Sequence, residues 1–298
     1  MQIRSRVLCL CTILLLLEAG CRTPAVPLES TPSGTPPAIL TSGQGTAPVP
    51  TELPEEIDLD PADWKDWPVL PVVTQGMINV YQLGQRLGND PRAFSVFGDC
   101  QSLPDVFLGV YANDIPLLFS LAPELQETVF FFYDSMARQN PALLPGTTTA
   151  SLLTPAWTHH WVLCSPEETP VECELRLNRP SFVLITIGTH WTERNREYVA
   201  RILDGLLADG IVPILFTKAD SSDQDEHINY EYASLAAEYG LPLVNFWAVV
   251  ADLPERGLYV RPEQEHLGKV YLTDEASQRF REVALQGLDR VWRSLTGR

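Results

Sequence analysis

The fold is decided by residues 182–216, which read FVLITIGTHWTERNREYVARILDGLLADGIVPILF and hold a strand, a helix and a second strand in succession. The runs 182–187 and 211–216 are apolar at nearly every position, as is typical of strands covered by helices on both faces of a parallel sheet. Between them, 193–208 has apolar residues at helical spacing and is soon followed by Gly210, a residue type that commonly ends a helix. The stretch predicts one right-handed strand–helix–strand unit.

Similar apolar runs and amphipathic stretches extend this unit along the chain. Three more buried strands are expected, at 93–97, 128–133 and 243–246. A further helix is expected at 226–239, and Thr273 is a residue type that commonly caps the start of a helix. Strands alternating with helices of this length predict an α/β domain of three layers, α/β/α, around a mainly parallel sheet of about five strands.

In sheets of this class, ligands bind outside the carboxyl ends of the strands. Gly98, Gly188 and Lys218 each follow an expected strand, so all three should lie at that edge. Two interpretations of Lys218 stay open: contact with a substrate anion, or a surface lysine whose aliphatic stem lies over the sheet edge.

Composition excludes several classes of function. The chain has 298 residues, 45% of them hydrophobic, which is enough for a buried core. Its formal net charge is -17, and no cluster of Lys and Arg offsets it. Such a surface repels phosphate backbones and anionic lipid headgroups, so nucleic-acid binding and membrane docking through a basic patch are not expected.

The N-terminal part predicts export. Residues 1–21 have a short basic start and an apolar run of signal-peptide length, and small residues precede Cys21. This end resembles the bacterial lipoprotein cleavage box, in which the cysteine is lipidated, although Glu18 stands where the box usually carries Leu. The protein is then expected on the outer face of the cell membrane, held by its lipid alone; an ordinary secretory signal is the alternative. Residues 22–56, rich in Pro, Thr and Ser, predict a disordered tether before a domain at 57–298.

Three cysteines remain in that domain. Cys164 and Cys173 flank a turn-rich loop and predict a disulfide in an oxidising compartment. A rival interpretation adds His159 and His160 to them as a zinc site, although no closely spaced CxxC or HxxxH pair supports it. No metal or other cofactor is otherwise expected.

The third cysteine, Cys100, lies in Phe97-Gly98-Asp99-Cys100-Gln101, between an expected strand and an expected helix. Backbone N–H groups at such a position stabilise a thiolate and can form part of an oxyanion hole. A buried structural cysteine at a strand end is the alternative, because cysteines favour such positions.

Four short motifs occur in an order that resembles the GDSL/SGNH hydrolases, a family of flavodoxin-like α/β esterases and acylhydrolases. The family's Gly-Asp-Ser corresponds to Gly98-Asp99-Cys100, and its second-block glycine to Gly146. Its Gly-x-Asn-Asp corresponds to Gly188-Thr189-His190-Trp191, and its C-terminal Asp-x-x-His to Glu263-Gln264-Glu265-His266. Three of the four motifs carry a substitution, and together they span about 94–281.

The resemblance implies an ester hydrolase without a cofactor, acting on a small-molecule ester or an acylated envelope or extracellular glycan. Cys100 is the implied nucleophile, His266 the base and Glu263 the residue that orients it. Gly146, His190 and the N–H of Cys100 are the implied oxyanion donors. The substituted residues remain chemically competent, because a thiolate beside a histidine is a strong nucleophile and a neutral imidazole N–H can donate as Asn does.

Two other functions stay open. Three substitutions are also what an inactive descendant would carry, so a glycan-binding module with Trp157, Trp161 and Trp191 as stacking surfaces is the alternative. A thiol redox protein is less favoured, because no CxxC pair includes Cys100. A further histidine, His227, follows Asp223, Asp225 and Glu226 at the start of an expected helix. A carboxylate–histidine pair is conceivable there, but a solvated helix cap is the favoured interpretation.

Overall fold

A parallel sheet of four strands forms the centre of the fold in the computed structural model, which describes residues 53–158, 162–189, 194–219 and 227–298. The strands are arranged in chain order and comprise β1 (Asp90–Phe97), β2 (Pro180–Ile185), β3 (Val212–Phe216) and β4 (Leu243–Val244). The expected signal segment 1–21 and most of the expected tether 22–56 lie outside the described residues.

The two strands within residues 182–216, β2 and β3, lie side by side at the centre of the sheet. Phe182 of β2 is in register with Phe94 of β1 and with Val212 of β3. Every residue of β2 and β3 is buried, which is why both read as continuous apolar runs. The parallel sheet predicted from these runs is confirmed.

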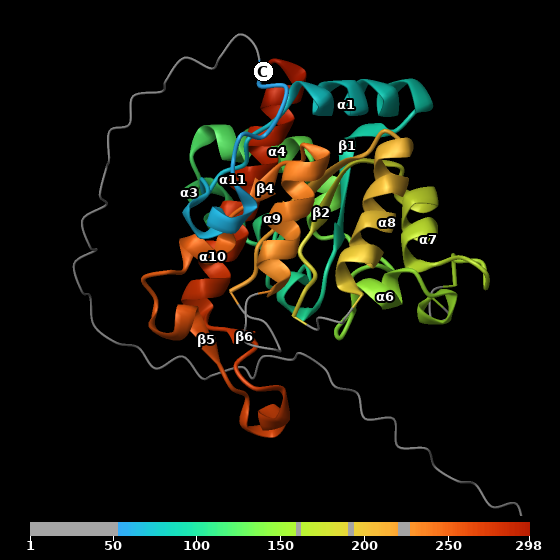
Figure 1. Cartoon of the computed structure of the whole chain (residues 1–298). Coiled ribbons are helices and arrows are strands. Elements are labelled where there is room, and N and C mark those ends of the chain that lie inside the picture. Colours follow the sequence, from blue (N-terminus) through green and yellow to red (C-terminus); the bar gives the residue numbers. More distant parts are fainter. Residues whose placement is uncertain (1–52, 159–161, 190–193, 220–226) are drawn as a thin grey trace, which may run out of the picture. The chain divides into compact units, whose positions relative to one another are not determined.

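Helices cover both faces of the sheet, giving the three layers expected (Figure 1). Each crossover moves to the next strand in the same direction, so right-handed connections put their helices on one face. That layer consists of α7 (Pro170–Asn178), α8 (Asn195–Ala208) and α9 (His227–Tyr239). The other layer consists of α1 (Gln75–Leu87) and α11 (Asp274–Thr296), which lie outside the crossovers and contact each other.

Short helices and a small ribbon fill the connections. They are η1 (Pro61–Asp66), η2 (Cys100–Ser102), α2 (Val110–Asn113), α3 (Ile115–Ser120), α4 (Pro123–Phe131), α5 (Tyr133–Met136), α6 (Thr149–Leu152), η3 (Pro155–Trp157), α10 (Phe246–Val249), η4 (Pro254–Gly257), β5 (Leu258–Tyr259), η5 (Pro262–Leu267) and β6 (Tyr271–Leu272). The strands β5 and β6 pair antiparallel, and the loop between them projects past the carboxyl ends of the central sheet (Figure 1).

The strand expected at 128–133 is wrong, and the sheet has four strands where about five were predicted. The run belongs to α4 and α5, and α4 begins with Pro123 in its first turn, where a missing N–H is tolerated. Two aromatic residues of the run pack on Trp292 of α11: Phe131 is stacked on it at 4.4 Å between ring centroids, and Phe132 contacts it edge-on at 5.6 Å. A short apolar run does not separate a buried strand from a buried helix, and here burial against α11 decides the outcome.

Among the described residues no strand pairs along the outer edge of β1, and other groups satisfy its backbone. The N–H of Phe94 donates to Ser135 Oγ at 3.1 Å, and Asn140 Nδ2 donates to the carbonyl of Val96 at 3.3 Å. Farther along, the N–H of Gly98 donates to the carbonyl of Ala142 at 3.1 Å. These contacts blunt an edge that would otherwise offer unpaired groups to another strand.

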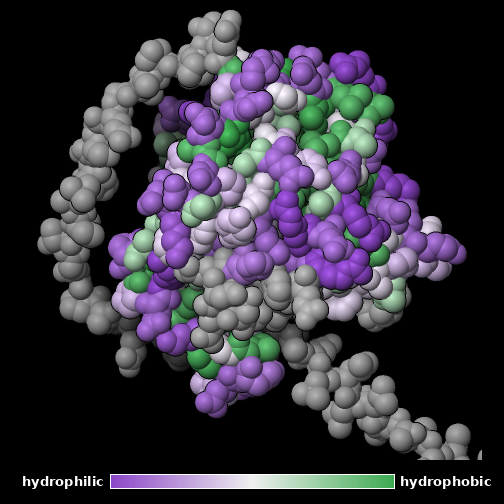
Figure 2. Space-filling view, in the orientation of Figure 1, coloured by the Kyte–Doolittle hydropathy of each residue, from purple (hydrophilic) through white to green (hydrophobic). Residues whose placement is uncertain are grey.

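The outer surface of the α8–α9 layer is mainly hydrophilic, with apolar residues in small separate patches (Figure 2). No helix in the described residues is long and apolar enough to cross a bilayer.

Candidate functional site

Cys100 lies at the carboxyl edge of the sheet, at the first position of η2. The preceding residue, Asp99, caps this short helix by accepting a hydrogen bond from the N–H of Gln101 at 3.0 Å. Asp99 and Gln101 are both buried, whereas Cys100 between them is half-buried. The turn therefore leaves the cysteine partly exposed while it anchors the two neighbouring residues.

Gly98 is required before this turn because the chains approach closely there. A Cβ on Gly98 would lie 2.5 Å from Thr186 Oγ1, on the segment that follows β2. That hydroxyl accepts from Ser102 Oγ at 2.7 Å and donates to the carbonyl of Phe97 at 3.3 Å. The hydrogen bonds tie both ends of the Gly98–Ser102 turn to the neighbouring strand.

Lys218, which follows β3, is buried beneath the same turn. Its side chain is 0% exposed, and its ammonium lies 3.6 Å from Oδ2 of Asp99, itself 1% exposed. The ammonium also donates to Gln101 Oε1 at 2.8 Å and to the carbonyl of Thr186 at 3.1 Å. Both interpretations offered for Lys218 are wrong, because this side chain reaches neither solvent nor an open ligand site.

The first turns of α9 hold Lys218 from the other side. Asn229 Oδ1 accepts from the backbone N–H of Lys218 at 2.7 Å, and Asn229 Nδ2 donates to its carbonyl at 2.9 Å. One turn later, the Tyr232 hydroxyl donates to the carbonyl of Ile187 at 2.7 Å. Burial, together with the negative charges of Glu231 and Asp99, raises the pKa of Tyr232 well above its usual value, so this hydroxyl remains a donor.

Of the expected oxyanion donors, Gly146 is described and His190 lies outside the described residues. Gly146 has a left-handed φ of 77° in the loop before α6, and nothing lies within 4 Å of where a Cβ would be. Its backbone is therefore accessible to a ligand. The following helix is fixed at its start by a reciprocal pair of hydrogen bonds between Thr148 and Ser151.

The expected base and its orienting residue, His266 and Glu263, both lie exposed on η5. Within the described residues, His266 makes no hydrogen bond or ion pair with Cys100 or Glu263. The η5 segment is nevertheless attached to the Gly98–Ser102 turn that carries Cys100, called the cysteine turn below. Gln101 Nε2 donates to the carbonyl of Val270 at 2.7 Å. The structure thus brings the loop of His266 to the rim without bringing its imidazole to the thiol.

A second histidine at this edge is held by a carboxylate. His227 Nε2 lies 3.4 Å from Glu231 Oε1, one turn along α9, and the histidine is half-exposed. Glu231 Oε2 accepts from Asn195 Nδ2 at 2.7 Å, and Asn195 Oδ1 accepts from Thr149 Oγ1 at 2.8 Å. The sequence favoured a solvated cap over a carboxylate–histidine pair at His227, and the structure shows a pair; the i,i+4 spacing of His227 and Glu231 was the signal for this partner.

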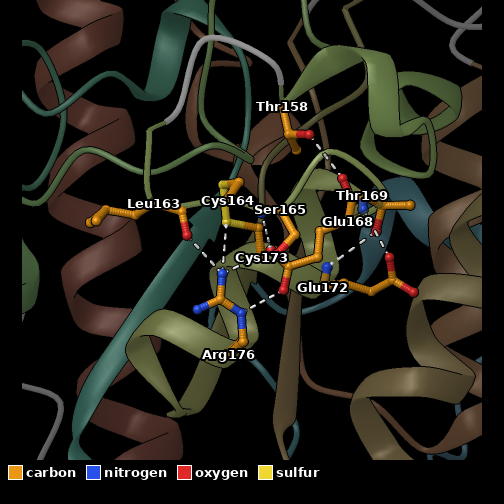
Figure 3. Close-up of polar contacts among 9 residues, drawn as sticks. All are labelled: Thr158, Leu163, Cys164, Ser165, Glu168, Thr169, Glu172, Cys173 and Arg176. Carbon is orange, nitrogen blue, oxygen red and sulfur yellow. Dashed lines mark hydrogen bonds and ion pairs between the residues drawn. A yellow bond between two sulfur atoms is a disulfide. The ribbon is translucent and has the colours of Figure 1, made fainter.

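Cys164 and Cys173 form a disulfide, with Cα atoms 5.4 Å apart. The loop that it closes is organised around Arg176, which donates from Nε to Glu168 Oε1 at 2.5 Å and from Nη2 to Glu168 Oε2 at 2.8 Å (Figure 3). The same guanidinium donates to the carbonyl of Leu163 at 2.8 Å. The hydrogen bonds from Arg176 to Glu168, together with one from the N–H of Ser165, lower the pKa of Glu168 to about 2.

The disulfide removes the basis of the zinc interpretation, because a zinc site requires both sulfurs as thiolates. His159 and His160, the other two ligands of that interpretation, lie outside the described residues. Trp161 and Trp191 also lie outside them, and Trp157 on η3 is half-buried.

No protein-family model matches the chain, and no curated protein matches it either.

Proposed function

We propose that this protein is an ester hydrolase of the SGNH type in which Cys100 is the nucleophile. The observation that supports it best is the half-buried position of Cys100 at the carboxyl edge of a parallel sheet, between two anchored neighbours. Ligands of open α/β sheets bind at that edge. A residue held there meets an incoming substrate with little loss of conformational entropy.

In the proposed reaction, the histidine base takes the proton of the Cys100 thiol. The thiolate attacks the carbonyl carbon of an ester, and the carbonyl oxygen becomes an oxyanion. The N–H groups of Cys100 and Gly146 and the imidazole of His190 donate to that oxygen. The intermediate collapses, the C–O bond breaks, and the alkoxide leaves with a proton from the histidine base. Water, deprotonated by the same base, then hydrolyses the thioester to a carboxylate and restores the thiol.

The base of this mechanism must reach the sulfur within about 3 Å. His266 holds the sequence position that corresponds to the family's catalytic histidine, and Glu263 the position of the residue that orients it, so in the proposed mechanism both side chains must turn toward the sulfur. His227 is the second described histidine near the carboxyl edge and already has a carboxylate partner. The substrate class proposed is a small-molecule ester or an acylated glycan of the cell envelope or extracellular medium, and no cofactor takes part.

One observation favours a second candidate, a non-catalytic binding module for glycans. His266 and Glu263 are both exposed, and among the described residues neither side chain makes a hydrogen bond or ion pair with the Gly98–Ser102 turn. In that case the domain would keep its fold but would not catalyse hydrolysis. Sugar rings would stack on Trp157, Trp161 and Trp191.

The test is hydrolysis of p-nitrophenyl acetate by the parent protein and by Cys100→Ala, Cys100→Ser, His266→Ala and His227→Ala variants. A cysteine hydrolase predicts loss of turnover in Cys100→Ala and in one histidine variant, and the other histidine variant is the matched control. If the parent and all four variants are inert while folded, binding of envelope glycans by the parent and by Cys100→Ala becomes the deciding measurement.

Export as a lipoprotein is part of the proposal. The disulfide between Cys164 and Cys173 supports it, because such bonds persist in oxidising compartments. A lipid on Cys21 would be the membrane contact, and secretion is the alternative. Detergent phase partition tests this: the parent should enter the detergent phase and Cys21→Ala the aqueous phase, whereas an aqueous parent would indicate secretion.

A further inference from the structure

We propose that Lys218 is a positioning residue for Cys100, holding the side chains on both sides of the thiol with one buried ammonium. The inference rests on the proposed function of Cys100 as a nucleophile. It concerns a residue that none of the four family-like motifs contains.

The geometry centres on the Lys218 Nζ atom. It lies 3.6 Å from Asp99 Oδ2 and 2.8 Å from Gln101 Oε1, so it contacts the residue before Cys100 and the residue after it. Its third acceptor, the carbonyl of Thr186 at 3.1 Å, belongs to the segment after the adjacent strand. A single cation therefore fixes the cysteine turn against two neighbouring strand ends.

The same arrangement extends to the loop that carries His266. Gln101 uses its oxygen for Lys218 and its nitrogen for the carbonyl of Val270, at 2.7 Å. An amide that accepts on one side and donates on the other has its orientation fixed by both partners. Loss of Lys218 would release Gln101, and with it the attachment between the cysteine turn and the 262–270 loop.

Burial separates a positioning role from substrate binding. The Lys218 side chain is 0% exposed, so a substrate at the rim does not touch it. A charge in such a place is costly to desolvate and is retained only with close partners. Asp99 provides the opposite charge, and its own side chain is 1% exposed.

Several titratable groups surround this ammonium. Asp99 faces it from the end of β1, with Cys100 as the next residue in the chain, and Tyr232, Glu231 and His227 lie on α9, the helix that holds the Lys218 backbone. Tyr232 stays protonated through the neutral range, because its pKa is raised well above its usual value. Of the described groups, Lys218 and Asp99 form the pair of opposite charges that lies at the cysteine turn itself.

The two charges should act on the thiol with opposite sign. Removing the ammonium leaves a carboxylate that disfavours the thiolate, and removing the carboxylate leaves an ammonium that favours it. We expect Lys218→Met to raise the pH midpoint of Cys100 alkylation, and Asp99→Asn to lower it, each by about one pH unit, or tenfold in thiolate population. The double variant should return close to the parent.

The experiment measures the pH profile of iodoacetamide labelling of the Cys100 peptide in the full-length protein, by mass spectrometry. Lys269→Met is the matched control, since Lys269 is an exposed lysine on the neighbouring loop and should leave the midpoint unchanged. Circular dichroism establishes which variants are folded. If Lys218→Met does not fold, Asp99→Asn and the double variant still test the sign of the effect.

Shifts of the same sign in both single variants, or no shift in folded variants, would overturn the proposal. Because labelling requires no ester turnover, its result is independent of the proposed hydrolase activity. An inert parent with opposed shifts would refute the hydrolase and leave the positioning role standing. An active parent with unshifted variants would support the hydrolase and refute the positioning role of Lys218.

Discussion

Gly84 and Gly210 meet backbone to backbone, and their contact fixes how α1 lies on the sheet. A Cβ on Gly84 would be 2.1 Å from the carbonyl oxygen of Gly210, and one on Gly210 would be 2.2 Å from the nitrogen of Gly84. Gly84 is in the last turns of α1, whereas Gly210 is in the turn between α8 and β3, with a left-handed φ of 67°. The contact thus joins α1 to the turn that connects α8 to the start of β3.

Gly84→Ala should destabilise the protein by about 1–3 kcal/mol, because the new methyl group meets backbone atoms that do not yield easily. Gly205→Ala is the control: Gly205 lies exposed in α8 with nothing within 4 Å of its added Cβ. There, alanine should be neutral or stabilise by about 0.5–1 kcal/mol. Urea unfolding measures both, and equal effects of the two substitutions would contradict the close contact.

Reduction of the Cys164–Cys173 bond, or its replacement by Cys164→Ser with Cys173→Ser, should lower the free energy of unfolding by roughly 3 kcal/mol. The closed loop is short, with a sequence separation of 9. Cys100→Ser is the control, since that residue is outside the disulfide. Urea unfolding with and without reductant checks this, and a reductant effect that persists in the double serine variant would assign the loss elsewhere.

Glu168 should contribute stability that disappears in acid. Its pKa in the folded protein is lowered to about 2 by Arg176 and the N–H of Ser165, so its stabilising effect is present above the unfolded-state value of 4.5. It is lost as the pH falls through that range toward 2. The free energy of unfolding should therefore fall less between neutral pH and pH 3 in Glu168→Gln than in the parent. Glu172→Gln, in the first turn of α7, is the comparison, and an identical acid response in both variants would refute the assignment.

Ser135→Ala should destabilise by about 1–3 kcal/mol, because it leaves the buried N–H of Phe94 without its acceptor. Ser120→Ala is the control, since its hydroxyl is exposed and the change should stay within about 0.5 kcal/mol. Thermal unfolding compares the two. The account of the β1 edge fails if the loss in Ser135→Ala is no larger than in Ser120→Ala.

The central strands could be predicted from sequence because strands that are buried on both faces consist of continuous apolar runs. The same signal misled at 128–133, where the apolar residues are buried against Trp292 of α11 and not between two layers of helices. Helix α11 was easier, because Thr273 accepts a hydrogen bond from the N–H of Ala276 as an N-cap residue should. Helix caps can be predicted because they depend on neighbouring residues. Packing partners that are distant in the chain leave no signal in a short stretch of sequence.

The site was predictable only in part, for the same reason. Cys100 could be placed at the carboxyl edge from its position after an apolar run. The burial of Lys218 could not, because it depends on Asp99 and Gln101, which are more than a hundred positions away in the chain. The pairing of His227 with Glu231 lay within one helical turn, but its support by Asn195 came from another helix.

The most direct test of the central claim, that Cys100 is a nucleophile, is the mass of the Cys100 peptide after brief mixing with p-nitrophenyl acetate and acid quench. The account predicts an acetyl thioester on that peptide in the folded parent, above the level found in an unfolded sample, with the deacylation rate reduced in the variant that removes the histidine base. Turnover by the parent with no acetyl group on Cys100, or unchanged turnover in Cys100→Ala, would contradict it.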